Sequence, residues 1–252
     1  MQNRQGAFQI LKGPDGRSVQ SENWVMYMRK MQVLGIDLKD YSIRESMRKV
    51  DEFLHDGKVS SIAYITTKGL MEANESPEIR EWMVSMDLTI ARDADILHAA
   101  GVESRSRIRE VEDNAFMEEF LRKLARGRKT VFLLAETKEC LGELSEGLLD
   151  YQGNLQIVGT YAMEELQADE DYVVNEINIA APNVIISMLP SPRRESFYKE
   201  NHMKLNADIW MMVKDGTKLG NQHKSIWGNL SDKMLKTIFK RRVMRFRKET
   251  DE

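Results

Sequence analysis

The chain has 252 residues, of which 42% are hydrophobic and 31% are charged, and its formal net charge is -3. This balance excludes a disordered chain and predicts a hydrophobic core, built as one large domain or as two closely packed lobes. The single cysteine, Cys140, excludes an intrachain disulfide and a cysteine-based zinc site, so a reducing, cytoplasmic compartment is the expected setting.

The N-terminal stretch predicts neither a signal peptide nor a membrane span. Residues 1–20 form an expected N-terminal extension, in which Gly13-Pro14-Asp15-Gly16 predicts a turn. No segment of the sequence approaches the roughly 20 apolar residues that a membrane-spanning helix needs. We therefore expect a protein that does not cross a membrane.

The first regular elements predicted are a helix and a strand. Apolar residues at helical spacing predict a helix over residues 43–56, and Ser42 and Glu45 form a capping box at its start. Gly57 is expected to end this helix. The partly β-branched run at 60–66, bounded by turn-forming residues, is typical of a buried strand.

The same alternation of helix and strand repeats along the rest of the chain. Helices are expected around residues 116–124, 141–148, 173–180 and 195–204, and strands around 130–134, 155–159, 184–188 and 207–212. Amphipathic helices between apolar strands predict parallel pairing, because a parallel crossover needs a helix to cover the sheet. The expected fold is α/β and Rossmann-like, with a mostly parallel sheet flanked by helices over residues 21–228 and a basic amphipathic helical appendage over 229–252.

Open α/β sheets bind ligands beyond the carboxyl ends of their strands, so the residues directly after each strand are candidates for chemistry. Four such segments carry polar or charged side chains, and they span residues 66–69, 91–95, 135–138 and 189–195. We expect them to meet at one edge of the sheet.

The segment at 189–195 predicts an anion site. Ser191 can cap a helix and Pro192 suits the first helical position, which places Arg193 and Arg194 at a positive helix end. Phosphate binds there through helix-terminal N–H groups and bidentate guanidinium contacts. The alternative is that Ser191 only caps the helix and both arginines are solvated.

Two carboxylates in the segment at 91–95 are candidates for catalysis. Asp93 and Asp95 have the D-x-D spacing of a divalent-metal site, and either could act as a general base on a sugar hydroxyl. Alternatively, Asp93 caps the helix that follows. Arg109 lies beyond them among alternating arginines, a pattern that fits a solvated segment as well as a diphosphate clamp.

Several other classes of site lack their motifs. The chain has no G-x-G-x-x-G and no phosphate-binding loop with G-K-[ST], which excludes the usual dinucleotide and P-loop sites. Its 4 histidines are scattered without metal-ligand spacing, and no nucleophile elbow is present. These observations argue against a metalloenzyme and a hydrolase.

The C-terminal segment is amphipathic and basic. Apolar residues from Leu230 to Phe246 form one stripe at helical spacing, and most of the surrounding lysines and arginines lie off it. Such a helix can rest on an anionic membrane, where each basic residue contributes on the order of 1 kcal/mol. The alternative is that the stripe docks on the protein's own core. A nucleic-acid surface is opposed by the lack of stacking aromatics and by the acidic balance of the whole chain.

Taken together and in order, these segments resemble the WecG/TagA/CpsF family of bacterial glycosyltransferases. The resemblance covers roughly residues 31–248. It is carried by Val33-Leu34-Gly35-Ile36, the capped helix, the strand ending at Ile65-Thr66, the segment around Arg109, Val131-Phe132-Leu133-Leu134, Leu155-Gln156-Ile157-Val158-Gly159-Thr160, and Val174-Asn175-Glu176-Ile177-Asn178 through Ser191-Pro192-Arg193-Arg194-Glu195.

The resemblance implies an inverting transfer of an N-acetylmannosamine-type sugar from a UDP donor to a lipid-linked, polyprenyl acceptor in cell-surface polysaccharide synthesis. It implies no required metal or other cofactor. It also implies a cytoplasmic protein that is peripheral at the inner face of the plasma membrane, with no nucleic-acid partner, and it leaves a homo-oligomer open. The residues expected to contact the membrane are Lys236, Phe239, Lys240, Arg241 and Phe246.

The same resemblance implies the site residues. Asp93 is the expected catalytic base and Asp95 the second choice, because the aspartate of the family's P-D-G is displaced here by about one residue. The expected substrate-binding residues are Thr66, Lys68, Arg109, Ser191, Arg193 and Glu195. Three departures stand out: Lys68 replaces the asparagine of the family's T-P-N, Arg194 replaces the glutamine of its S-P-R-Q-E, and residues 213–216 replace a glycine-rich stretch.

These departures support an alternative function, that of a noncatalytic homologue which binds nucleotide sugars or acts as a scaffold. A cavity that joins Thr66, Asp93, Arg109 and Arg193 would favour the enzyme. Salt bridges of Lys68 or Arg194 inside the site would favour the noncatalytic homologue.

Overall fold

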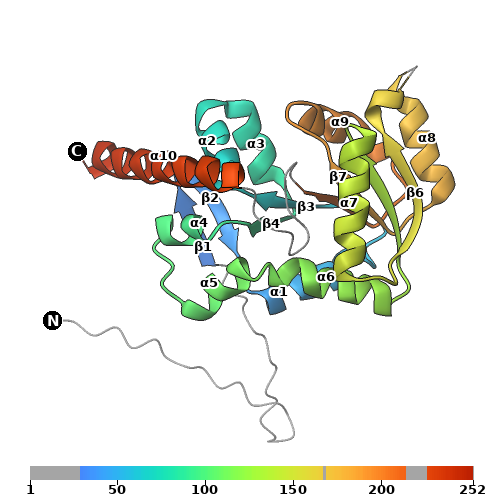
Figure 1. Cartoon of the computed structure of the whole chain (residues 1–252), viewed down its shortest axis with the longest axis horizontal. Helices are drawn as coiled ribbons and strands as arrows, with labels where there is room; N and C mark the ends of the chain where they lie inside the picture. Colours follow the sequence, from blue (N-terminus) through green and yellow to red (C-terminus); the bar gives the residue numbers. More distant parts are fainter. Residues whose placement is uncertain (1–28, 167–168, 214–225, 252) are drawn as a thin grey trace, which may run out of the picture.

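The computed structural model describes residues 29–166, 169–213 and 226–251 of the chain (Figure 1). The turn expected at 13–16 and the extension expected at 1–20 lie outside these residues. In chain order the elements are β1 (Arg29–Val33), β2 (Ile36–Asp40), α1 (Ile43–Phe53), β3 (Ser60–Ile65), α2 (Thr67–Glu75), α3 (Pro77–Ser85), β4 (Leu88–Ala91), α4 (Ala94–Ala99), α5 (Arg105–Glu112), α6 (Ala115–Arg126), β5 (Thr130–Ala135), α7 (Lys138–Tyr151), β6 (Gln156–Ala162), η1 (Met163–Glu165), α8 (Glu170–Ala180), β7 (Val184–Met188), α9 (Arg193–Asn201), η2 (His202–Lys204), β8 (Ile209–Met212) and α10 (Ile226–Asp251).

Strands β3 to β8 form one six-stranded sheet in the order β4-β3-β8-β7-β5-β6. All neighbouring strands in this sheet are parallel, which confirms the expected α/β, Rossmann-like fold. The last strand, β8, pairs with both β3 and β7, so Ile209 lies between Ser60 and Val184. The loops that follow β3 and β7 therefore flank the carboxyl end of β8.

Helices cover both faces of this sheet (Figure 1). Alternate residues of a strand point to opposite sides, and both sides of the central strands carry apolar side chains that the helices bury. On β3, Ala63 and Ile65 belong to one buried cluster, whereas Ile62 and Tyr64 belong to the other. The first cluster also contains side chains of α2, α3, α4, α5, α8, α9, α10 and the segment 31–38, and the second contains side chains of α1, α6 and α7. Burial on both faces explains why the central strands are continuous apolar runs in the sequence.

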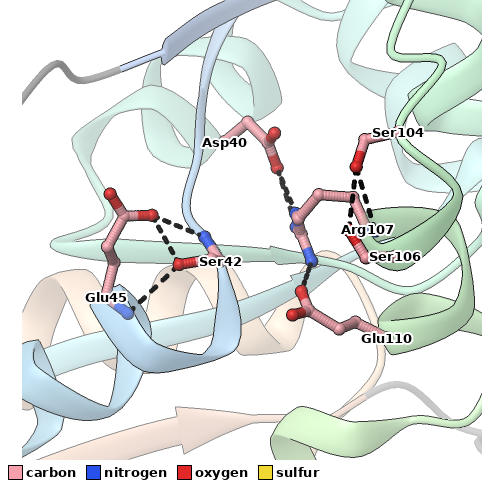
Figure 2. Close-up of polar contacts among 7 residues, drawn as sticks. All are labelled: Asp40, Ser42, Glu45, Ser104, Ser106, Arg107 and Glu110. Carbon is pink, nitrogen blue, oxygen red and sulfur yellow. Dashed lines mark hydrogen bonds and ion pairs between the residues drawn. The ribbon is translucent and has the colours of Figure 1, made fainter.

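Helix α1 begins where the sequence predicts. The N–H of Glu45 donates to Ser42 Oγ at 3.4 Å and the N–H of Ser42 donates to the Glu45 carboxylate at 2.8 Å, so the predicted capping box is present (Figure 2). The helix ends at Phe53 rather than at residue 56, with Leu54 as its C-cap. Gly57 follows with φ of 67°, a left-handed conformation that favours glycine.

A two-stranded antiparallel hairpin, β1–β2, precedes the sheet and was not predicted. Leu34 and Gly35 both have positive φ, 54° and 70°, as the tight turns of such hairpins require. The guanidinium of Arg107 donates to Asp40 at 2.7 Å and to Glu110 at 2.5 Å (Figure 2). Because Arg107 and Asp40 are both buried, this ion pair fixes α5 to the hairpin.

Helix α10 packs against the body of the protein. Phe239 is fully buried, Val243 is 9% exposed, and the ring of Phe246 lies so close to Gly35 that a Cβ there would come within 2.9 Å of it. Arg242 pairs with Glu75 of α2 at 2.6 Å. The expected membrane contact of Phe239 and Phe246 therefore has to be corrected, because both rings pack on the protein's own core.

The side of α10 that faces away from the protein is basic, with apolar side chains among the charges. Arg241 and Arg245 are exposed on this side, and so are Met234 and Ile238, at 68% and 41%. Lys236 and Lys240 are exposed as well, but both ammonium groups pair with Asp95 of α4, so they point toward the body of the protein and not outward as expected. Among the helices of the described residues, none is long and apolar enough to cross a membrane.

Candidate functional site

The segments expected at the site follow the carboxyl ends of parallel strands. Residues 66–69 follow β3, residues 92–95 follow β4, residues 136–138 follow β5, and residues 189–195 follow β7. Because β3 and β7 both pair with β8, the first and the last of these segments lie on either side of one strand end. This is the edge at which open parallel sheets bind ligands.

A cavity of about 240 Å³ lies between the loop after β3 and the loop after β7. Its lining residues are Tyr64, Ile65, Thr66, Lys68, Gly69, Glu72, Trp82, Met83, Leu189, Pro190, Ser191 and Arg194. Three of the expected substrate-binding residues are among them, namely Thr66, Lys68 and Ser191. We call this space the nucleotide cavity, after the nucleotide-sugar donor that the resemblance implies.

The amino end of α2 forms one wall of the nucleotide cavity. Thr66 is the N-cap of α2, and its Oγ1 accepts a hydrogen bond from the N–H of Gly69 at 3.0 Å. Lys68 Nζ lies 3.6 Å from a carboxylate oxygen of Glu72, and 55% of the Lys68 side chain is exposed. An ion pair as exposed as this one is weak, so Lys68 remains available to a negatively charged ligand.

The amino end of α9 forms the opposite wall. The prediction that Ser191 caps this helix is wrong, because the N-cap is Pro192 and no side chain caps the helix. The peptide bond between Ser191 and Pro192 is cis, and the N–H of Arg194 donates to Pro190 O at 2.9 Å. Ser191 lines the cavity, and the helix end without a side-chain cap retains its capacity to bind an anion.

The two arginines of α9 have different surroundings. Arg193 donates to Glu136 at 2.6 Å and does not line the nucleotide cavity. Arg194 lines the cavity, pairs with Glu195 at 2.6 Å, and places its guanidinium 4.8 Å from the centre of the Trp82 ring. The Arg194 and Glu195 side chains are each 14% exposed, so this ion pair is largely buried.

Several polar atoms around Arg194 lack partners. Arg194 Nε, Glu195 Oε2 and Trp82 Nε1 are buried without a hydrogen bond among the described residues. Buried polar groups are normally paired, and leaving one unpaired costs about 1–3 kcal/mol. This wall of the cavity therefore has unused capacity for hydrogen bonding to a ligand.

The two candidate bases have different neighbours. Asp93 occupies the N-cap position of α4 without capping it, and its Oδ2 instead accepts the N–H of Thr67 at 2.7 Å. Asp95 is 9% exposed and lies 3.2 Å from Lys240 Nζ and 3.4 Å from Lys236 Nζ. Neither carboxylate lines the nucleotide cavity, but Asp93 is joined to its wall through the first turn of α2.

Tyr64 belongs to the inner wall of the nucleotide cavity. Its hydroxyl donates to Asn114 Oδ1 at 2.9 Å. Burial raises the pKa of Tyr64 well above its ordinary value of 10.0, so the hydroxyl stays neutral. Tyr64 therefore serves as a neutral wall residue and not as a base.

Arg109 does not join this cavity. Its side chain is exposed on α5, whereas Arg107 on the same helix is buried against Asp40. The cavity that would join Thr66, Asp93, Arg109 and Arg193 is not formed, since Thr66 alone of these four is among the lining residues. Glu195 is likewise absent from that lining.

Sequence reasoning missed three contributors to the cavity wall, namely Glu72, Trp82 and Met83. They come from α3 and α2, which follow β3 one after the other and carry no recognisable motif. The sequence predicted Arg194 at the anion site together with Arg193, and it predicted salt bridges of Arg194 in a noncatalytic homologue. The rotation of α9 about its axis decides that Arg194, and not Arg193, lines the cavity. The sequence pattern does not determine this rotation.

Residues 31–216 of the chain match the family model described as the glycosyl transferase WecG/TagA/CpsF family. No curated protein matches the chain significantly. The matched range includes all six strands of the parallel sheet and every residue that lines the nucleotide cavity. It ends before α10, the helix that packs on α2.

Proposed function

This chain belongs to the WecG/TagA/CpsF family of glycosyltransferases, which act in cell-surface polysaccharide synthesis, and we propose that it transfers a sugar from a UDP donor to a lipid-linked acceptor. We propose a donor sugar of the N-acetylmannosamine type and an acceptor with a polyprenyl chain. The observation that carries the proposal is the nucleotide cavity between the amino ends of α2 and α9, with Lys68 and Arg194 in its wall.

A diphosphate fits this cavity electrostatically. Each helix amino end carries about half a positive charge, and its N–H groups point toward a bound anion. Lys68 and Arg194 add two positive charges, and a bound diphosphate would share them with their partner carboxylates, Glu72 and Glu195. The sequence assigned the diphosphate to Arg109 and Arg193, but the geometry favours Lys68 and Arg194 for this role.

The proposed reaction is a single displacement with inversion. A carboxylate takes the proton of the acceptor hydroxyl, whose oxygen bonds to the anomeric carbon while the bond from that carbon to UDP breaks. Asp93 is the proposed base, because its hydrogen bond to Thr67 holds it beside the cavity wall. Asp95 is the second choice. Lys68 and Arg194 stabilise the departing diphosphate, so the proposal includes no metal or other cofactor.

Asp93→Asn tests the proposed base. Transfer is expected to be abolished and UDP binding largely retained, because the asparagine oxygen can still accept the N–H of Thr67. Turnover is measured with a panel of UDP-sugars, and UDP affinity by calorimetry, with Asp95→Asn in parallel. Full activity in both single variants would refute the mechanism.

Arg194→Gln tests the proposed diphosphate contact, and Arg193→Gln is its matched control. Loss of a charge-assisted hydrogen bond costs about 1.5–3 kcal/mol, so UDP binding to Arg194→Gln is expected to weaken at least tenfold. Arg193 pairs with Glu136 outside the cavity, so its variant is expected to bind UDP nearly as tightly as the parent protein. An equal loss in the two variants would contradict the assignment.

We further propose that the protein is cytoplasmic and that α10 brings it to the inner face of the plasma membrane. The support is the outward face of the helix, where Arg241 and Arg245 accompany Met234 and Ile238, whereas Lys236 and Lys240 pair with Asp95 of α4. Arg241→Glu is expected to reduce sedimentation with anionic vesicles. If the unmodified protein sediments equally with anionic and neutral vesicles, this part of the proposal fails.

A second function is favoured by the ion pairs in the cavity wall, namely that of a noncatalytic nucleotide-sugar-binding or scaffolding homologue. Lys68 pairs with Glu72, Arg194 pairs with Glu195, and Asp93 holds the amino end of α2. A donor screen in the presence of anionic vesicles separates the two functions. Binding of UDP-sugars with neither transfer nor hydrolysis of any donor would identify the noncatalytic homologue.

A further inference from the structure

A second and larger cavity follows the groove between α3 and α9, two helices that face each other in Figure 1. Its volume is about 920 Å³, which is large enough for a ligand of several rings. Trp82 and Ser191 line both this groove and the nucleotide cavity, so the two spaces adjoin. At its far end the groove reaches Lys58 and Val59, which precede β3.

The charge of the groove is opposite to that of the nucleotide cavity. Its carboxylates outnumber its basic side chains, with Glu78, Glu81, Asp87, Glu195 and Glu200 against Lys58 and Lys199. Carboxylates at this density repel a phosphate group. A second nucleotide or a phosphorylated ligand is therefore a poor occupant.

The groove combines apolar surfaces with hydrogen-bond acceptors. Trp82, Tyr198 and Met203 contribute ring and thioether surface, and Met203 is 85% exposed. The carboxylates of Glu78 and Glu81 form no ion pair with any described residue. A sugar ring matches this combination, because its C–H face packs on an aromatic surface while its hydroxyls donate to carboxylates.

Trp82 separates the groove from the nucleotide cavity. The guanidinium of Arg194, which lines the nucleotide cavity, lies over its ring, and the partner of Arg194, Glu195, lines the groove. Trp82 Nε1 and Glu195 Oε2 are both buried and unpaired at this boundary. A hydroxyl-rich ligand at the junction would supply partners for both atoms after a small side-chain movement.

We propose that the groove between α3 and α9 binds an uncharged saccharide, the sugar portion of the acceptor, and presents it to the nucleotide cavity at Trp82. Its role as acceptor rests on the proposed glycosyltransferase function, whereas the binding of a saccharide does not. The groove supplies carboxylate acceptors and an apolar floor, and the nucleotide cavity supplies the positive charge.

The test uses the full chain and the neutral disaccharide N,N′-diacetylchitobiose, with binding measured by saturation-transfer NMR and UDP affinity measured on the same samples. The Glu78→Gln/Glu81→Gln variant is expected to bind the disaccharide about tenfold more weakly and UDP unchanged, because both altered side chains lie in the groove. Glu112→Gln, at an exposed position outside the groove, is the control and is expected to match the parent protein.

Unaltered disaccharide binding in the double variant, an equal loss in the control, or no binding to the parent protein would overturn the proposal. So would a preference of the groove for an oligolysine peptide, which would indicate a cationic protein partner. UDP binding without saccharide binding would refute the groove and leave the proposed function intact. Saccharide binding without UDP binding would support the groove and refute the proposed function.

Discussion

Replacing Phe239 by alanine tests how α10 is held on the protein. Phe239 is fully buried, and an aromatic side chain buries about 150–250 Å². At about 25 cal/mol per Å² this corresponds to roughly 4–6 kcal/mol, an upper bound because the unfolded chain already buries part of this area. Measured truncations of buried Phe cost about 3–5 kcal/mol. We expect this loss to fall mainly on the docking of α10, which Leu235, Val243, Phe246 and the ion pairs with Glu75 and Asp95 would then maintain.

Hydrogen exchange followed by mass spectrometry measures this docking directly. Because about 3 kcal/mol corresponds to more than a hundredfold change in an opening equilibrium, protection of α10 is expected to fall by at least that factor in Phe239→Ala. Protection of the central strand β7 is expected to change little. Ile238→Ala is the matched control, because Ile238 precedes Phe239 on the same helix and its side chain is 41% exposed. Unchanged protection in Phe239→Ala, or an equal loss in the control, would refute the docking argument.

Three further substitutions follow from buried or strained positions. Arg107→Ala leaves Asp40 as a buried carboxylate without its partner, so urea denaturation is expected to show a loss of about 3–5 kcal/mol; a loss below about 1 kcal/mol would contradict the burial of this pair. Gly35→Ala places a Cβ within 2.9 Å of the Phe246 ring of α10, at a residue whose φ is 70°. It is expected to lower the melting temperature more than Gly57→Ala, because Gly57 has a similar φ of 67° but open space around it. Equal losses in the two variants would show that the Phe246 ring moves aside. Because burial raises the pKa of Tyr64 above 10.0, the unfolded state releases this proton first, so stability falls as the pH rises above about 10. Tyr64→Phe is expected to reduce that fall in denaturation curves, and an unchanged slope would exclude Tyr64 as its source.

The sequence predicts the elements of this fold better than their arrangement. The strand starting at Thr130 and the capping box of Ser42 and Glu45 are local patterns, and both are found where the residues predict them. The β1–β2 hairpin was missed because its turn, Leu34-Gly35, lacks the usual Asn-Gly or Asp-Gly signal. The strand order depends on pairings between distant residues, which periodicity does not encode.

The same division applies to the site. The strand-end rule correctly places Thr66, Lys68 and Ser191 at one cavity, because it depends only on which residues follow a strand. Which of two adjacent arginines faces the cavity depends on where α9 starts, and its N-cap is Pro192 rather than the expected Ser191. The ion pairs of the wall join residues from separate elements, so no local pattern indicates them.

The structure also gives a physical reason for one motif of the resemblance. Gly159 lies on β6 opposite Phe132, and a Cβ at this position would come within 2.6 Å of the Phe132 ring. The pairing of β5 with β6 shifts register at this point. Packing against Phe132 therefore requires a glycine at position 159. The Ile157-Val158-Gly159 motif indicates the fold and gives no evidence on the reaction.

The central position of β8 has a consequence for the order in which the chain can fold. As the last strand in sequence, β8 joins β3 and β4 on one side to β7, β5 and β6 on the other. During synthesis, the backbone edges of β3 and β7 that pair with β8 therefore stay unpaired until residue 212 has left the ribosome. The two walls of the nucleotide cavity belong to these separate halves, so we expect ligand binding to arise in one late step. A chain ending before Ile209 is expected to aggregate through these edges and to have no partial activity.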